Sequence, residues 1–193
     1  MTLLATIAAR PAVTSAEREG MFALFSRYYE NTNFARFEAD LATKTWVLLL
    51  QSQRGDIAGF STVQRYRHTC ANGEQLTVLY SGDTVVDRAY RTNTALAGAF
   101  GHLMLEAVKD SSGVPTYWLL TSKGPRTYRF LPVFFNDYLP RPGATAPSPC
   151  AKQRLDEIAR AKFGNAYRAD RQIVEHAGTR DRVRETEHHP RLL

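Results

Sequence analysis

Cysteine is almost absent from this sequence. Among 193 residues only Cys70 and Cys150 occur, far apart and without CxxC spacing. Structural zinc sites and disulfide frameworks both need several cysteines at regular spacings, so the pattern argues against each of them. We therefore expect two reduced thiols, as is usual in a cytoplasmic protein, and no metal.

Long apolar runs are also lacking. No segment approaches the roughly 20 apolar residues that a helix needs to cross a bilayer. The first apolar stretch, Leu3 to Ala9, is short, follows no basic leader and runs directly into Arg10 and Pro11. These features predict a first β-strand in place of a secretory signal peptide.

Motifs that recognise nucleic acids are missing too, although the chain is basic. It has 25 Lys and Arg against 19 Asp and Glu, a formal charge of +6. About half of this excess lies after Cys150, with no helix-turn-helix, zinc-finger or RNP-type pattern beside it. A basic surface equally suits an acidic protein partner or a phosphate-bearing ligand. Charge alone therefore does not select a function.

Material for a hydrophobic core is plentiful: 44% of the residues are hydrophobic and 11% are aromatic. With this length, the composition predicts one domain of ordinary size. Apolar residues alternate or run continuously where strands are expected, and recur every three or four residues where helices are expected. The predicted strands are 3–9, 46–50, 57–67, 75–86 and 116–121. The predicted helices follow Thr14, Arg91 and Pro125 or span 33–42 and 151–163.

Two local signals refine this order. Thr14 and Glu17 have the spacing of a capping box, which predicts a helix start. Pro132 lies within the helix expected after Pro125 and should kink or shorten it. The tight turns between the second, third and fourth strands predict an antiparallel meander, and the whole order predicts a mixed α/β fold.

The C-terminal part differs in composition. Residues 140–149 contain four prolines and one glycine, which is typical of a linker. We therefore predict a main domain over residues 1–141, a linker over 142–150 and a helical, charge-rich extension over 151–193.

The most informative junction leads from the fourth predicted strand into a helix. The backbone N–H groups and the positive dipole end at a helix start bind phosphate without any special side chain. Arg88 and Arg91 flank this junction and can add charge-assisted hydrogen bonds. The predicted phosphate-binding residues are Val85, Val86, Arg88, Arg91, Thr92, Asn93, Thr94 and Ala95. An ordinary strand-to-helix turn with two surface arginines is the alternative.

This junction and the order of elements resemble the GNAT acyltransferase superfamily. In that family the corresponding turn reads like Val-x-Pro-x-Tyr-Arg-Gly-x-Gly-x-Gly and holds the pyrophosphate of an acyl-CoA. This sequence keeps Val86, Tyr90 and Arg91 in phase, and has Thr92, Thr94 and Leu96 at the glycine positions. The resemblance extends over about residues 3–141, through Phe37-x-x-Asp40-Leu41-x-x-Lys44, Gly59-Phe60-Ser61-Thr62 and the stretch from Lys123 to Arg141.

The resemblance implies a twisted, mostly antiparallel central sheet flanked by helices, and transfer of an acyl group to an amine. The sequence is similar in particular to the branch of fatty-acyl N-acyltransferases, N-acyl amino acid synthases and peptide-lipidating maturases. The replaced glycines weaken the case for a diphosphate donor such as acyl-CoA. A phosphopantetheine arm carries one phosphate, so an acyl carrier protein, which is acidic, is an alternative donor and partner.

The resemblance also implies roles for individual residues. The backbone amides of Val85 and Val86 are candidates to stabilise the oxyanion. Asp83 could take the proton from the amine, and Tyr128 could protonate the leaving thiolate. Glu30 lies where the acceptor amine is recognised in the family, and Lys123 could contact the donor phosphate.

Four hypotheses stay open at the level of sequence. The first is an N-acyltransferase that uses a fatty acyl thioester and an amino acid, peptide or small amine. The second is an acetyl-CoA-dependent small-molecule N-acetyltransferase. The third is a non-catalytic module that binds an acyl thioester. The fourth is nucleic-acid binding through the basic tail, which predicts a steep dependence on salt.

Overall fold

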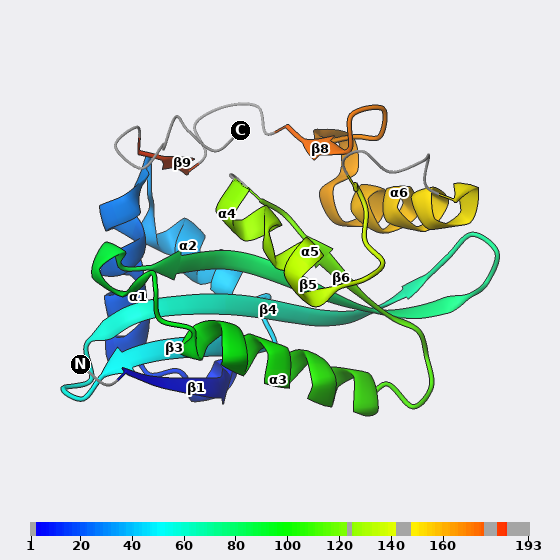
Figure 1. Cartoon of the computed structure of the whole chain (residues 1–193). Helices are drawn as coiled ribbons and strands as arrows, with labels where there is room; N and C mark the ends of the chain where they lie inside the picture. Colours follow the sequence, from blue (N-terminus) through cyan, green and yellow to red (C-terminus); the bar gives the residue numbers. More distant parts are fainter. Residues whose placement is uncertain (1–2, 123–124, 142–147, 176–180, 185–193) are drawn as a thin grey trace.

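A five-stranded sheet organises the chain (Figure 1). The computed structural model describes residues 3–122, 125–141, 148–175 and 181–184. Its strands are β1 (Leu3–Ala9), β3 (Trp46–Ser52), β4 (Ile57–Thr69), β5 (Gln75–Val86) and β6 (Thr116–Leu120). They lie in the order β1-β3-β4-β5-β6. All neighbours are antiparallel except β5 and β6, which run parallel. The predicted mixed α/β fold with a mostly antiparallel sheet is confirmed.

Helices cover both faces of the sheet. The helices α1 (Ser15–Tyr28) and α2 (Phe34–Leu41) lie on one face and α3 (Ala95–Lys109) on the other (Figure 1). The capping box predicted for α1 is present, because Thr14 and Glu17 each bond the other's backbone N–H. Asn33 caps α2 by accepting from the Arg36 N–H at 2.9 Å.

The core divides along these layers. One cluster joins α1 and α2 to the sheet through residues such as Phe25, Phe37 and Phe60. A second cluster joins α3 to the opposite face through Leu48, Val63 and Leu96. Burial of these apolar surfaces is the main force that fixes the layers.

The segment after β6 differs from the expected single helix. It forms two short helices, α4 (Pro125–Tyr128) and α5 (Phe130–Phe134), with the break at Arg129. Pro132 is the third residue of α5, where a helix has no acceptor for the backbone N–H and loses nothing by its absence. The single helix expected here is thus divided into two short ones, and the break at Arg129 precedes Pro132.

The C-terminal extension packs on the same sheet. Helix α6 (Pro149–Phe163) begins two residues before its predicted start, with Ser148 as its cap and Pro149 at its first position. It contributes Ile158 to a third core cluster with Leu76, Val78 and Leu119 of the sheet. Most of the predicted linker, residues 142–147, lies outside the described residues.

Short elements complete the fold. Three 3-10 turns are η1 (Arg10–Ala12), η2 (Arg88–Tyr90) and η3 (Gly164–Ala166). Two small ribbons pair β2 (Tyr29–Glu30) with β9 (Arg182–Val183), and β7 (Tyr167–Arg168) with β8 (Ile173–Val174). The β2–β9 pair brings the C-terminal segment against the end of α1. Among the described residues, no helix has the length and hydropathy of a membrane span.

Candidate active site

Strand β5 contains an irregularity at its centre. Ser61 of β4 pairs with Thr84, whereas Val63, two residues later, pairs with Ser81. Gly82 and Asp83 of β5 therefore lie opposite the single residue Thr62, which is the definition of a β-bulge. A bulge bends its strand and re-aims the residues that follow it, so the second half of β5 leaves the plane set by the first.

The same point is where β5 and β6 separate. The last residues that pair in register are Ser81 and Leu120. Beyond them β5 continues for five residues, Gly82 to Val86, beside β4 alone. The edge of this segment that faces away from β4 has no neighbouring strand among the described residues. We call the region along this edge of β5, beyond the last residue that pairs with β6, the gap.

Backbone amides point into this gap. Along a strand, successive N–H groups point to opposite edges. The Asp87 N–H donates to the Ala58 carbonyl of β4 at 2.8 Å. The N–H groups of Val86 and Thr84 must therefore point to the other edge, where β6 has ended. Of the two predicted oxyanion amides, Val86 is directed into the gap and Val85 is directed toward β4.

Asp83 lies at the bulge itself, beside the start of the gap. Its carboxylate charge is one cause, after burial, that raises the pKa of Tyr29 to about 12. The two side chains therefore lie near each other, with Asp181 from the C-terminal segment adding to the same effect. Tyr29 stacks on Phe25 of α1 with ring centroids 4.5 Å apart, which holds the phenol in place. The bulge thus brings a carboxylate next to the α1–β2 junction.

The predicted phosphate turn connects the gap to α3. The side chain of Asp87 accepts from the Ala89 N–H at 3.0 Å and caps η2. Asn93 accepts from the Ala95 N–H at 2.9 Å, so Asn93, two residues before the helix, takes the capping role. The N–H groups of Leu96 and Ala97 follow in the first turn of α3, where a helix supplies no acceptor for them. Thr92, Asn93 and Thr94 are exposed around this helix start.

The two arginines of the turn are placed differently. The Arg91 guanidinium donates to the Val86 carbonyl at 3.3 Å and lies over the ring of Tyr28 at 5.0 Å. The backbone N–H of Arg88 donates to the Tyr28 hydroxyl at 2.7 Å, and its side chain is exposed. Arg91 therefore braces the turn from within, while Arg88 remains on the surface beside the start of α3.

The other predicted residues are distributed around this centre. Tyr128 donates its hydroxyl to the Pro140 carbonyl at 2.6 Å, and burial, with Tyr138 nearby, raises its pKa. Glu30 lies in β2, not at a helix end, and forms an ion pair with Arg182 at 3.0 Å. Lys123 lies outside the described residues. The structure thus brings together Asp83 and the Val86 turn, with Glu30 near the end of α1 and Tyr128 on a separate segment.

Comparison with known proteins identifies the fold. No family model matches the chain, and no curated protein matches it in sequence. The ribosomal-protein-alanine N-acetyltransferase of Brucella melitensis biovar Abortus 2308 superposes with a TM-score of 0.52 at 8% identity, over 76% of this chain and 100% of the other. Glucosamine-6-phosphate N-acetyltransferase of Arabidopsis thaliana gives 0.50 at 13% identity, over 76% and 100%.

A third solved structure is similar over a smaller share of its own chain. It is a probable N-acyltransferase of Enterococcus faecalis V583, with a TM-score of 0.53 and 13% identity, covering 67% of this chain and 32% of that one. With the meander, the bulge and the diverging parallel pair, these likenesses decide the architecture. The chain has the GNAT fold.

A buried lysine beside the bulge was not expected from the sequence to matter for the site. Lys44 follows α2, and its side chain is only 1% exposed. Its ammonium group bonds the Asp40 carboxylate at 2.9 Å and lies 5.3 Å from the ring centroid of Tyr80. Lys162 of α6 lies 4.5 Å from the same ring. The spacing of Asp40 and Lys44 on the sequence signalled the ion pair, and nothing signalled Lys162.

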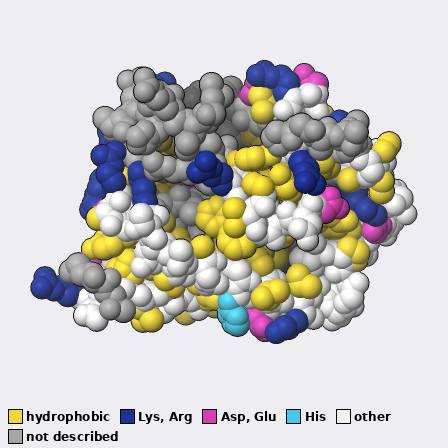
Figure 2. All heavy atoms as spheres, viewed as in Figure 1, with side chains coloured by type: hydrophobic (Ala, Val, Ile, Leu, Met, Phe, Trp, Pro, Cys, Tyr) yellow, Lys and Arg dark blue, Asp and Glu magenta, His cyan; other side chains and the backbone are white. Residues whose placement is uncertain are grey.

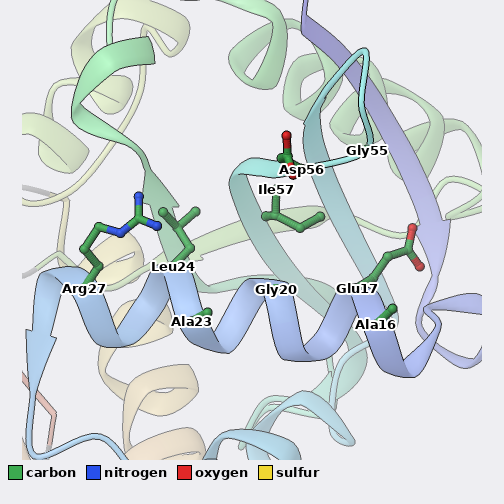
Figure 3. A pocket seen from close by; sticks show the side chains of 9 residues that line it. All are labelled: Ala16, Glu17, Gly20, Ala23, Leu24, Arg27, Gly55, Asp56 and Ile57. Atoms are coloured by element: carbon green, nitrogen blue, oxygen red, sulfur yellow. The ribbon is translucent and has the colours of Figure 1, made fainter.

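A shallow depression elsewhere in the GNAT fold carries none of the predicted residues (Figure 3). It has a volume of about 360 Å³ and lies between α1 and the β3–β4 turn. Gly20 faces Ile57 there, and a Cβ on Gly20 would come within 2.9 Å of the isoleucine side chain. Glu17 is held in the capping box, and Asp56 bonds Ser52 across the turn. Its polar groups therefore serve the local structure.

One further cluster contains potential metal ligands. The side chains of His68, Cys70 and Glu157 place their ligand atoms within 4.8 Å of one another. Burial and a hydrogen bond to Glu157 raise the pKa of the Cys70 thiol, which favours its protonated form. Metal ions bind the thiolate, so a metal ion at this cluster would have to displace the proton of Cys70.

Proposed function

We propose that the chain is an N-acyltransferase that binds an acyl thioester in the gap between β5 and β6. The observation that carries this proposal is the bulge at Gly82–Asp83 together with the end of β5–β6 pairing at Ser81. Asp83 would supply a carboxylate beside the start of the gap, and the edge of β5 that faces the gap would supply the backbone N–H groups of Thr84 and Val86. These N–H groups could donate hydrogen bonds to the carbonyl oxygen of a thioester in the gap.

The chemistry follows from these two groups. Asp83, directly or through one water, takes a proton from the ammonium group of the acceptor, and the free amine attacks the thioester carbonyl carbon. The Val86 N–H, with Thr84 beside it, stabilises the oxyanion. The C–S bond then breaks, the nitrogen gives its second proton to water, and the sulfur leaves as a thiolate that takes up a proton. Tyr128 is our candidate for that acid, because a phenol is protonated at neutral pH and can donate to a thiolate.

The phosphate of the donor would lie at the start of α3. The first-turn N–H groups of Leu96 and Ala97 and the helix dipole attract an anion there. Arg88 is exposed beside this turn and would add a charge-assisted hydrogen bond. Thr92 and Thr94 occupy the turn with side chains that glycine lacks. A single phosphate, as in phosphopantetheine, needs less room than a diphosphate, so we propose an acyl carrier protein as donor, with acyl-CoA as the alternative.

An apolar surface near β6 supports a long acyl chain. Val133 and Phe134 of α5 are exposed, and Phe130 and Phe134 stack with ring centroids 5.7 Å apart. Phe135 reaches back to Trp118 of β6 at 5.3 Å. Figure 2 shows hydrophobic side chains gathered over α4 and α5 on this face of the molecule. A fatty acyl chain leaving the gap on this side could cover these rings, and an acetyl group could not.

The test is product analysis by mass spectrometry with defined donors. Acetyl-, octanoyl- and palmitoyl-CoA, and the same acyl groups on acyl carrier protein, are each incubated with the protein and a pool of amines. Amide formed from a long-chain donor supports the full proposal. Turnover of acetyl-CoA alone would keep N-acyl transfer and remove the fatty acyl donor. Binding of every donor without amide formation would leave a non-catalytic thioester-binding module.

The catalytic assignment is tested with Asp83→Asn against Asp110→Asn. Loss of a general base reduces turnover by about 10²- to 10⁴-fold, while donor binding should remain. Asp110 follows α3 on the opposite face, its side chain is exposed, and its ion pair with Arg65 is long at 3.8 Å. Asp110→Asn should keep full activity. Equal activity of the two variants would remove Asp83 from the mechanism.

A further inference from the structure

A cluster of polar groups on the α1–α2 face of the sheet lies directly beside the bulge. Gly82 defines its centre, because a Cβ on this residue would stand 2.6 Å from Thr62 Oγ1 and 3.1 Å from Lys44 Nζ. The ammonium and hydroxyl groups therefore converge on one point, and only glycine leaves that point unoccupied. Gly82 precedes Asp83, so the cluster adjoins the proposed base.

In the part of the chain that the structure describes, two hydroxyl groups of the cluster have no hydrogen-bond partner. Thr62 is 2% exposed, and its Oγ1 atom has no hydrogen-bond partner among the described residues. The buried hydroxyl of Tyr66 has none either among them. A buried polar atom that stays unsatisfied costs free energy, so its presence needs an explanation such as a bound ligand. Both atoms can donate a hydrogen bond to an oxygen.

The cluster contains two lysines, Lys44 and Lys162, and one carboxylate, Asp40, that pairs with a lysine of the cluster among the described residues. Asp40, with its side chain 50% exposed, pairs with Lys44. Lys162 from α6 bonds the neutral side-chain oxygen of Gln64 and lies over the rings of Tyr66 and Tyr80 at 5.9 and 4.5 Å. Within the described part of the chain no carboxylate forms an ion pair with Lys162. Burial, and then the charge of Lys44, lower the pKa of Lys162, and the charge of Asp40 offsets this only in part.

We infer that this cluster binds a carboxylate of the acceptor, so that the substrate is an amine that also carries an oxyanion. Lys162 and Lys44 supply the charge, and Thr62 and Tyr66 supply neutral donors. The position favours the acceptor over the donor. Donor phosphate is proposed at the start of α3, beyond Val86, whereas this cluster adjoins Asp83 on the face covered by α1 and α2. An acceptor held here would present its amine to Asp83.

The inference also gives α6 a role in the reaction. The α6 helix lies after the proline-rich segment, and Lys162 is its penultimate residue. It reaches Gln64 of β4 and the ring of Tyr80 of β5, both in the central sheet. The C-terminal extension would then complete the acceptor site, and its Lys162 would be a specificity-determining residue.

The experiment compares acceptors that differ only in the anion. Alanine and phenylalanine are assayed against alaninamide and phenylalaninamide, and phosphoethanolamine against ethanolamine, with the donor found active above. The inference rests on the proposed function and expects the acids to be preferred. Lys162→Met should raise the KM for the acids by about tenfold or more, the scale of a hydrogen bond to a charged group, with the KM for the amides unchanged. Lys162→Arg should restore part of the preference.

Two further variants separate a binding role from a structural one. Thr62→Val keeps the shape of the side chain and removes an unsatisfied hydroxyl, so it should fold as well as the wild type and bind the acids more weakly. Lys109→Met changes a lysine on α3 whose side chain is 70% exposed, and should have no effect. An equal rise in KM for acids and amides in Lys162→Met would overturn the inference. A preference for phosphoethanolamine alone would replace the carboxylate by a phosphate.

A binding measurement keeps the two proposals distinguishable. Calorimetric titration with N-acetylalanine and N-acetylalaninamide reports the anion site without any turnover. If no donor is consumed but the acid binds and Lys162→Met abolishes its binding, the anion site stands and the catalytic proposal fails. If turnover occurs without discrimination between acids and amides, the proposed function stands and the anion site fails.

Discussion

The two halves of strand β5 have the same neighbour on one side and different surroundings on the other. From Thr77 to Ser81 the strand lies between β4 and β6, and from Gly82 to Val86 its only neighbouring strand among the described residues is β4. The first half contains residues with almost no exposure, such as Val78 and Leu79, whereas most of the second half is half-buried. One strand thus supplies a structural half and a half with free backbone edges, and a single extra residue separates them.

The comparison teaches that the proposed chemistry depends on lost pairing. A strand edge without a partner normally exposes N–H and C=O groups that favour aggregation. Here α1 and α3 flank the sheet on either face, and the open edge is short. The N–H groups of Thr84 and Val86 face no strand among the described residues and could therefore serve a ligand, while β6 faces the same edge of β5 from Thr77 to Ser81.

The largest effect on stability should come from the paired half. Leu79 is 1% exposed, and Leu79→Ala would remove buried atoms and leave a cavity, lowering the free energy of unfolding by about 2–5 kcal/mol. Turnover per folded molecule should change little, because Leu79 lies before the bulge. Urea unfolding with a parallel assay at low temperature checks both. A specific loss of activity in the folded fraction would show that the two halves are not separable.

Gly82→Ala tests the boundary between the halves and should have the next largest effect. The new Cβ would meet Thr62 Oγ1 at 2.6 Å, and a threonine side chain is stiff at χ1. Overpacking of this kind costs about 1–3 kcal/mol. The double variant Thr62→Ala with Gly82→Ala should recover part of the loss, since it removes the clashing atom. Purely additive losses in urea unfolding would argue against this contact.

Trp118→Phe tests how firmly the paired half ends. The indole N–H of Trp118 donates to the Ser81 hydroxyl at 2.9 Å, at the last residue of β5 that pairs with β6. Losing the donor should cost about 1 kcal/mol, and more if the buried Ser81 hydroxyl stays unsatisfied. The cycle with Ser81→Ala isolates the bond. A coupling energy near zero would mean that packing of Trp118 on Phe100 and Phe135, and not this bond, fixes the end of the pairing.

The sequence was sufficient to predict the full extent of β5 and insufficient to predict the bulge that divides it. A run of apolar and β-branched residues predicted β5 over the range that the structure shows. The spacing of Thr14 and Glu17 predicted the start of α1. These signals are local. The bulge was not predictable, because an extra residue in β5 is visible only against the register of β4.

Parts of the candidate site were hidden for a related reason. Lys162 reaches the ring of Tyr80 from α6, and Arg182 pairs with Glu30 from the C-terminal segment. Both contacts join residues far apart in the sequence, and no periodicity announces them. The apolar spacing of α1 runs through Tyr28 and Tyr29 and gives no sign that Tyr29 and Glu30 pair with β9 in a two-stranded ribbon.

The smallest effect expected is electrostatic and concerns Asp83 and Tyr29. Burial is the main cause that raises the pKa of Tyr29 from 10.0 to about 12, and the charge of Asp83 is the next. Because the folded pKa lies above the unfolded one, the fold favours the protonated phenol. The stability from this group is complete below about pH 10 and is lost as the pH rises toward 12.

Asp83→Asn removes one negative charge and should lower the pKa of Tyr29 while leaving it above 10, because burial remains. The phenolate absorbance is titrated in the wild type and in Asp83→Asn, with Tyr29→Phe in each background to isolate this one tyrosine from the others. An unchanged pKa of Tyr29 in Asp83→Asn would mean that Asp83 does not face the α1–β2 junction. The proposed acceptor site, which needs Asp83 on the same face as Lys44 and Thr62, would then lose its base.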